Sequence, residues 1–205
     1  TASGATTWSV TPGAYLVLGQ PDFGSSDANN GGLSASSLSF PRGAALAGTK
    51  FAMADSYNHR VLIWNSVPTS NHTSADVVLG QPDFMSFADN NGGVSGRSLF
   101  DPQSVASDGK RLFVYDNQNC RVLVWNSVPT SSDTSADVVL GQPTFSTDTP
   151  NNGGVSAASL SHSPGGLWSD GTRLFVTDAA NHRVLIWNSI PATNHTSPIA
   201  ATTAC

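Results

Sequence analysis

The chain repeats one pattern three times. An eight-residue segment beginning at Asn58 returns at Asn119 and at Asn181, reading NHRVLIWN, NCRVLVWN and NHRVLIWN. A second marker, Gly-Gln-Pro, begins at Gly19, Gly80 and Gly141, a spacing of 61 residues each time. Repetition at a fixed period is typical of solenoids, propellers and arrays, in which one unit cannot bury its apolar faces alone. The fold therefore depends on the structure of one unit and on how the units stack.

The middle unit is predicted to form four short strands. Asp108-Gly109 is a strong hairpin signal between the first two strands, and Gly141 ends the fourth. No window shows apolar residues at helical spacing free of Gly and Pro. We expect strands at 102–107, 111–115, 121–125 and 137–140.

The third strand of each unit is apolar at consecutive positions. The run Val61-Leu62-Ile63-Trp64 predicts a strand with both faces buried, because a sheet with one face in water would alternate. Sheets packed between two other sheets occur in β-propellers. The first strands carry small residues, as expected where blades crowd toward a central axis. The fold class is predicted to be all-β, a β-propeller built from four-stranded blades.

The order of residues within each unit resembles the NHL repeat, which is named for Asn-His-Leu. In the middle unit the markers are Pro102, Asp108-Gly109, Asp116, Asn119 and Arg121. The resemblance covers three units from about Phe40 onward and implies a β-propeller fold. NHL propellers commonly close with six blades. Three NHL-like blades per chain would then be half of a six-bladed ring or a fragment of a longer propeller.

The repeat divides the chain into four parts. We expect an N-terminal segment at 1–39 with an Asn/Gly loop, and blades at 40–80, 81–141 and 142–205, the last two preceded by long loops. Residues 15–19 match a fourth strand, whereas the matching segment of the last blade is degraded and begins with Pro198. We expect residues 15–19 of one copy to latch onto the last blade of a second copy in a closed homodimer. A fragment of a longer protein and an edge-to-edge polymer remain alternatives.

Composition bears on location and partners. Charged residues make up 11% of the chain against about 25% in ordinary soluble proteins, which favours an extracellular or cell-surface location. The net charge of -5 and nine scattered basic residues argue against a nucleic-acid partner. No apolar run approaches about 18 residues, so we expect no membrane span. The opening residues Thr1 to Gly4 fit a processed, mature end.

Two other features of the composition leave alternatives open. Asn71 and Asn194 begin Asn-x-Thr triplets, which are glycosylated only in a eukaryotic secretory protein, and we interpret them as ordinary turn residues. Cys120 could pair with Cys205, but no framework spacing supports a disulfide, and a small buried apolar role is favoured for Cys120.

Recurring acids and bases are interpreted as structural. Asp55, Asp116 and Asp178 each lie five residues before an arginine, and the resemblance to NHL blades implies that each acid pairs with that arginine within or between blades. His59 and His182 suggest a channel metal, but the third equivalent is Cys120 and all three positions lie away from the innermost strand. We therefore predict no metal site here.

The Asp/Asn/Gly loops at 27–32 and 89–93 offer oxygen ligands beside glycines, as Ca²⁺ requires. They lack a closing bidentate Glu, and the third copy at 149–154 lacks the acid at its start. The favoured interpretation is a turn stabilised by side-chain to backbone bonds. We expect no cofactor, with calcium as the alternative.

Function is expected where the units differ. No Gly-x-Ser-x-Gly elbow, P-loop or CxxC motif is present. We predict ligand-binding positions after the first proline of a unit and in the turn between its second and third strands. A further position is Trp168 on the first strand of the third unit, which aligns with Leu46 and Ser107 of the other two units. These residues are Arg42, Tyr57, Gln103, Gln118 and Trp168.

The predicted function is a non-catalytic NHL-like propeller scaffold for protein or glycan binding or for self-assembly. The alternative is an enzyme of the six-bladed lyase or lactonase type that uses a metal in the central channel.

Overall fold

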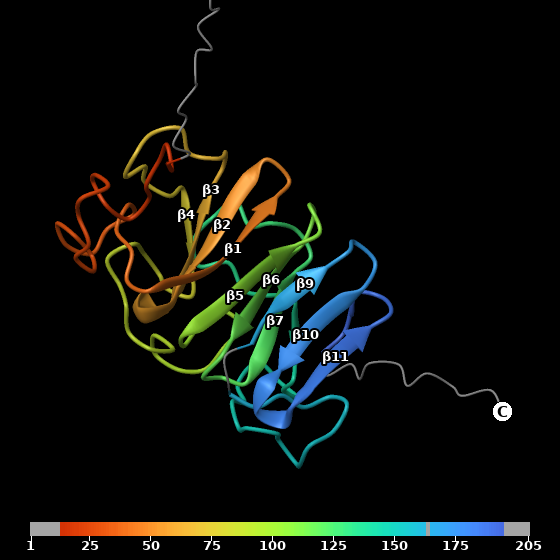
Figure 1. Cartoon of the computed structure of the whole chain (residues 1–205). Coiled ribbons are helices and arrows are strands. Elements are labelled where there is room, and N and C mark those ends of the chain that lie inside the picture. The colour runs from red at the N-terminus through yellow and green to blue at the C-terminus, as the bar shows by residue number, and fades with distance from the viewer. Residues whose placement is uncertain (1–12, 163–164, 195–205) are drawn as a thin grey trace, which may run out of the picture.

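The chain folds into three antiparallel β-sheets. The computed structural model describes residues 13–162 and 165–194, and no α-helix occurs among them. The sheets lie next to one another in chain order, from orange through green to blue (Figure 1). The strands are β1 (Pro41–Ala47), β2 (Lys50–Asp55), β3 (Arg60–Trp64), β4 (Val77–Leu79), β5 (Pro102–Ser107), β6 (Leu112–Asp116), β7 (Arg121–Trp125), β8 (Val138–Leu140), β9 (Leu167–Ser169), β10 (Leu174–Asp178) and β11 (Arg183–Trp187).

Each sheet is an antiparallel meander. Sheet 1 has the order β1-β2-β3-β4, sheet 2 has β5-β6-β7-β8, and sheet 3 has β9-β10-β11 among the described residues. The all-β prediction is confirmed, and the expected strands of the middle unit are shifted by at most one residue. Gly109 has a φ of 88° in the predicted hairpin turn, a conformation that glycine adopts without a Cβ clash. Three-residue 3₁₀ turns join β2 to β3 (Ser56–Asn58) and β10 to β11 (Ala179–Asn181).

The sheets pack face to face in the order of the sequence. We call the face of each sheet toward the following unit its forward face and the face toward the preceding unit its rear face. Two apolar cores result, one between the forward face of sheet 1 and the rear face of sheet 2, the other between sheets 2 and 3. The first core takes Ala52, Val61 and Ile63 from the forward face of sheet 1, and it takes Leu112 and Leu123 from the rear face of sheet 2.

The innermost strands approach one another closely. β1 lies beside β5, and β5 lies beside β9. A Cβ atom at Gly43 would lie 2.6 Å from the Ser104 Cα, so only glycine fits between these two strands. The prediction of small residues on crowded first strands agrees with this contact.

The forward face of sheet 3 differs from the expectation that third strands are buried on both sides. Every residue of β3 and β7 is buried, but in β11 Val184 is 55% exposed and Ile186 is 43% exposed. The reason is that no described residue provides a further sheet to cover this face.

Two further expectations change. The register pairs Trp168 with Phe175, as Ala106 pairs with Phe113 and Ala45 with Ala52. Trp168 is therefore equivalent to Ala45 and Ala106, and the alignment with Leu46 and Ser107 was wrong by one residue. Because side chains alternate along a strand, that single step moves Trp168 from the rear face to the forward face.

The expected latch at residues 15–19 does not form a strand within its own chain. Only an isolated parallel bridge joins Gly19 to Ser37. The degraded counterpart that begins at Pro198 lies outside the described residues, as does Cys205. Across the part of the chain that the structure describes, no helix is long and apolar enough to cross a membrane.

Candidate functional site

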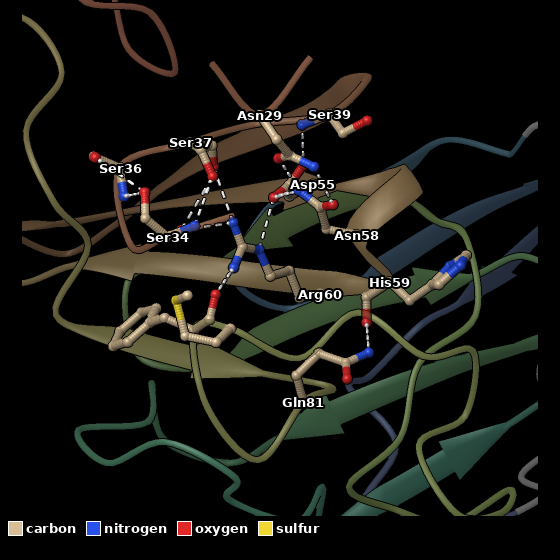
Figure 2. Close-up of polar contacts among 12 residues, drawn as sticks. Asn29, Ser34, Ser36, Ser37, Ser39, Asp55, Asn58, His59, Arg60 and Gln81 are labelled. Atoms are coloured by element: carbon tan, nitrogen blue, oxygen red, sulfur yellow. Dashed lines mark hydrogen bonds and ion pairs between the residues drawn. The ribbon is translucent and has the colours of Figure 1, made fainter. Parts of the chain in front are cut away.

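Each sheet carries an Asp–Arg ion pair, which is fully buried in sheets 1 and 2 and partly buried in sheet 3. In sheet 1 the Arg60 Nε donates to Asp55 Oδ2 over 2.7 Å, and both side chains are fully buried. The guanidinium also donates to the carbonyl oxygens of Phe84, Ser34 and Ser37 at 2.7 to 2.9 Å (Figure 2). Arg60 thus ties sheet 1 to the loops on either side of it in the sequence.

The carboxylate of Asp55 is equally well bonded. Its Oδ1 accepts the Ser39 backbone N–H at 2.7 Å, and its Oδ2 accepts the Asn58 amide at 2.7 Å. Burial raises the pKa of Asp55, while the charge of Arg60 and these hydrogen bonds oppose that rise. Asn58 also exchanges two hydrogen bonds with Asn29, which anchors the Asp/Asn/Gly loop to the turn before β3 (Figure 2).

The same network recurs in the other units. Arg121 bonds to Asp116 and Arg183 to Asp178, each over 2.8 Å, which confirms the predicted pairing. The matching amide pairs are Asn90 with Asn119 and Asn151 with Asn181. The third loop, which lacks the initial acid, makes the same amide pair as the other two. These hydrogen bonds favour a structural role for the loops.

The positions considered for a metal have other partners. His59 Nδ1 accepts the Asp101 backbone N–H at 3.2 Å, and burial lowers the pKa of this histidine, so the acceptor nitrogen stays unprotonated. Cys120 is buried, and desolvation raises the pKa of its thiol to about 12. Within the described ranges, no three His, Cys, Asp or Glu side chains are grouped closely enough to hold a metal.

Arg42 and Gln103, two of the predicted ligand-binding residues, lie together. Both line a cavity of about 430 Å³ where the first strands of the three units meet. The rest of its wall consists of Gly43, Ser104 and Gly165. Gly165 is the third residue of the series that begins with Arg42 and Gln103, so the cavity lies where this position differs between units.

Tyr57 is not part of the cavity wall but is linked to Arg42 through Phe40, a residue that the sequence interpretation missed. Its ring stacks on Phe40 with centroids 4.5 Å apart and planes 9° from parallel. The Arg42 guanidinium covers Phe40 at 4.9 Å from the ring centroid. Both rings are about half exposed. A signal was available, because the residue before the first proline also differs between units, being Phe40 in one and Asp101 in the next.

The two remaining predicted residues are separate from the cavity wall. Gln118 is exposed in the β6–β7 turn, at the position equivalent to Tyr57, and its backbone N–H bonds to the Phe100 carbonyl. Trp168 lies on the forward face of sheet 3 with its ring 4.9 Å from that of Phe175. The structure therefore brings together Arg42, Tyr57 and Gln103, and it places Trp168 on a different surface.

The architecture defines an all-β repeat protein in which an Asp–Arg network ties each sheet to its flanking loops and apolar cores join the sheets. In comparisons with known proteins, no protein family matches the chain, and no curated protein is similar enough in sequence to count as a relative.

Proposed function

We propose that this chain is a non-catalytic β-propeller scaffold of the NHL type that completes its ring by pairing with a second copy. The three sheets pack face to face in sequence order, with their first strands side by side, as blades around an axis would. The observation that carries the pairing is the uncovered forward face of sheet 3.

This forward face has the composition of a buried interface. Trp168 is 57% exposed, and Val184 and Ile186 are also largely open to solvent. Their equivalents on sheet 2, Val122 and Val124, are fully buried against sheet 3. The same kind of surface is thus covered where a following sheet is present and uncovered where none is described. Several apolar side chains exposed together mark an interaction site rather than ordinary surface.

The rear face of sheet 1 offers the complementary surface. Leu46 is 61% exposed on β1, and Phe51 and Met53 on β2 are only partly buried. On sheet 2 the residues equivalent to this β2 pair are Leu112 and Val114, and both are buried by the forward face of sheet 1. The forward face of sheet 3 and the β1–β2 part of the rear face of sheet 1 therefore correspond to the two halves of an interface that the described sheets already make twice. The β3 part of that rear face is covered within the chain, where Leu62 and Trp64 pack with Leu18 and Leu38.

Residues 15–19 are the source that we propose for a fourth strand on sheet 3, which has three strands among the described residues. The Val17 N–H donates to Asn71 Oδ1 and its carbonyl accepts the His72 N–H, both at 3.0 Å. The equivalent Val78 of β4 makes the same pair of bonds to Ser132 and Asp133 of the following unit. Residues 15–19 thus occupy, against sheet 1, the place that β4 occupies against sheet 2.

Pairing two copies would cover the exposed faces at both ends of the described stack of sheets. If sheet 3 packs on sheet 1 of a partner as sheet 1 packs on sheet 2, then β11 lies beside residues 15–19 of that partner and gains a fourth strand. A two-fold axis repeats the contact and leaves no face uncovered, whereas a rotation that does not close produces a filament. Two chains with three sheets each give six sheets in the ring.

The test is the solution mass of the chain by light scattering over a range of concentrations. We expect one species of twice the 21.2 kDa chain mass. Val184→Lys places a charge in the proposed interface and should yield a folded monomer. Val155→Lys adds the same charge at an exposed loop position and should leave the dimer intact.

Circular dichroism of each variant checks that the sheets remain folded. A monomer for the unmodified chain at all concentrations would overturn the pairing proposal, and so would a dimer that Val184→Lys leaves unchanged. An open-ended series of masses would replace the closed pair with a filament.

A further inference from the structure

Arg42 differs from every other arginine of the chain. Arg60, Arg121 and Arg183 form the buried pairs, and Arg97, Arg111 and Arg173 pair with nearby aspartates. Arg42 has no carboxylate within ion-pair distance among the described residues, and it lines the cavity of about 430 Å³. A guanidinium of this kind is the group best suited to binding a carboxylate through two parallel hydrogen bonds.

The guanidinium is held in place without being neutralised. It lies 4.9 Å from the Phe40 ring centroid, and Phe40 in turn stacks on Tyr57. Cation–π contact orients the planar group while leaving its N–H donors available. Phe40 has a φ of 56°, and Asp101 at the equivalent position has a φ of 54°, so this backbone conformation belongs to the repeat.

The rest of the cavity supplies hydrogen-bonding groups of both kinds. Gln103 is buried, and its Nε2 donates to Asp101 Oδ2 at 2.8 Å, which fixes the amide and leaves its Oε1 as an acceptor. The Ser104 Oγ accepts the Leu167 N–H at 3.0 Å, which leaves its hydroxyl proton to donate. Asp101 is not part of the cavity wall, and its Oδ2 accepts from the amides of Gln103 and Asn117.

These groups together favour one class of ligand. A carboxylate would meet Arg42, and hydroxyl groups would meet Gln103 and Ser104, which line the same open hollow. We propose that the cavity binds an acidic sugar, such as a terminal uronic acid, with Arg42 on its carboxylate. This site goes beyond the pairing function and uses residues of a single copy.

The test compares two probes that differ in one group. The methyl glycoside of glucuronic acid carries a carboxylate where methyl glucoside carries a hydroxymethyl group. Each is titrated into the ¹⁵N-labelled full chain while the Arg42 Nε–H and Gln103 side-chain resonances are followed. We expect the acidic sugar to shift both resonances with at least about tenfold higher affinity than the neutral sugar, because charged hydrogen bonds exceed neutral ones by that order.

Two variants assign the effect. Arg42→Gln keeps hydrogen-bonding capacity without the charge, and it should weaken binding of the acidic sugar by about tenfold or more. Arg97→Gln removes an equal charge from an exposed pair and should leave the affinity unchanged. The proposal is overturned if neither probe shifts the Arg42 and Gln103 resonances, if the two probes bind equally well, or if Arg97→Gln weakens binding as much as Arg42→Gln does.

Discussion

Replacing Arg121 with alanine tests whether the buried network stabilises sheet 2 and its flanking loops. Arg121 is fully buried and donates four hydrogen bonds. Its Nε binds Asp116 Oδ2 at 2.8 Å, and its two Nη atoms bind the carbonyl oxygens of Phe145, Ser95 and Ser98 at 2.6 to 2.9 Å. Alanine would leave the Asp116 carboxylate without its counter-charge and would remove a donor from three carbonyls, of which that of Ser95 still accepts from the Ser98 N–H and hydroxyl.

The expected loss follows from these contacts. Breaking a buried ion pair by removing one partner costs about 3–5 kcal/mol, and each buried acceptor left without a donor costs about 1–3 kcal/mol. Water entering the space would satisfy some of the carbonyls, so we expect a total of about 5 kcal/mol. For a chain of this length that corresponds to a melting temperature lower by about 10–20 °C.

The measurement is urea unfolding followed by circular dichroism at one fixed protein concentration, because association shifts apparent stability. Arg173→Ala is the matched control, since Arg173 forms an equally short pair with Asp170 at the surface and should change the free energy of unfolding by at most about 1 kcal/mol. Arg183→Ala should fall between them, because that side chain is 24% exposed. If Arg121→Ala were no more destabilising than Arg173→Ala, the structural role assigned to the network would be wrong.

Two shorter predictions concern packing. In a Cys205→Ser chain, the Cys120 thiol should not react with iodoacetamide at pH 8 until the protein is unfolded, because its burial and its pKa of about 12 keep it protonated; labelling of the native chain at the rate of an exposed cysteine would contradict this. Gly141→Ala should cost about 1–3 kcal/mol more than Gly153→Ala in thermal melts, since both residues have positive φ but only a Cβ at 141 would lie 2.6 Å from Leu160 Cδ1; equal losses would show that Leu160 moves aside freely.

The strands could be predicted because their signals are local in the sequence: the hairpin turn at Asp108-Gly109 and the apolar third strands identify the sheets. The Asp–Arg pairs are predicted by the resemblance to NHL blades, which implies that each aspartate pairs with the arginine five residues later. Asp116 and Arg121 indeed pair across β6 and β7. Local patterns suffice where the contact lies within one hairpin.

The surroundings of Arg42 and Trp168 depend on contacts between units or on register, which local patterns do not fix. Arg42 and Gln103 lie 61 positions apart, and only the packing of β1 beside β5 brings them to one cavity. The role of Phe40 can be recognised only from its stacking on Tyr57, which lies in the turn between β2 and β3. An alignment of Trp168 that is one residue off assigns it to the opposite face, and with it to a different partner.

The residues of the third unit also bear on what covers its forward face. Terminal units of repeat proteins carry polar outer faces when they end a stack in solvent. Here Val184 and Ile186 keep the side-chain types of the interior positions Val61 and Ile63, and Trp168 is far larger than Ala45 and Ala106. On the rear face of sheet 1, Ala44 is correspondingly smaller than its equivalents Val105 and Leu167, and a large residue facing a small one is how packed layers interdigitate. The end of the described stack therefore has the residue types of an interior face, which agrees with the proposed packing of sheet 3 on sheet 1 of a second copy.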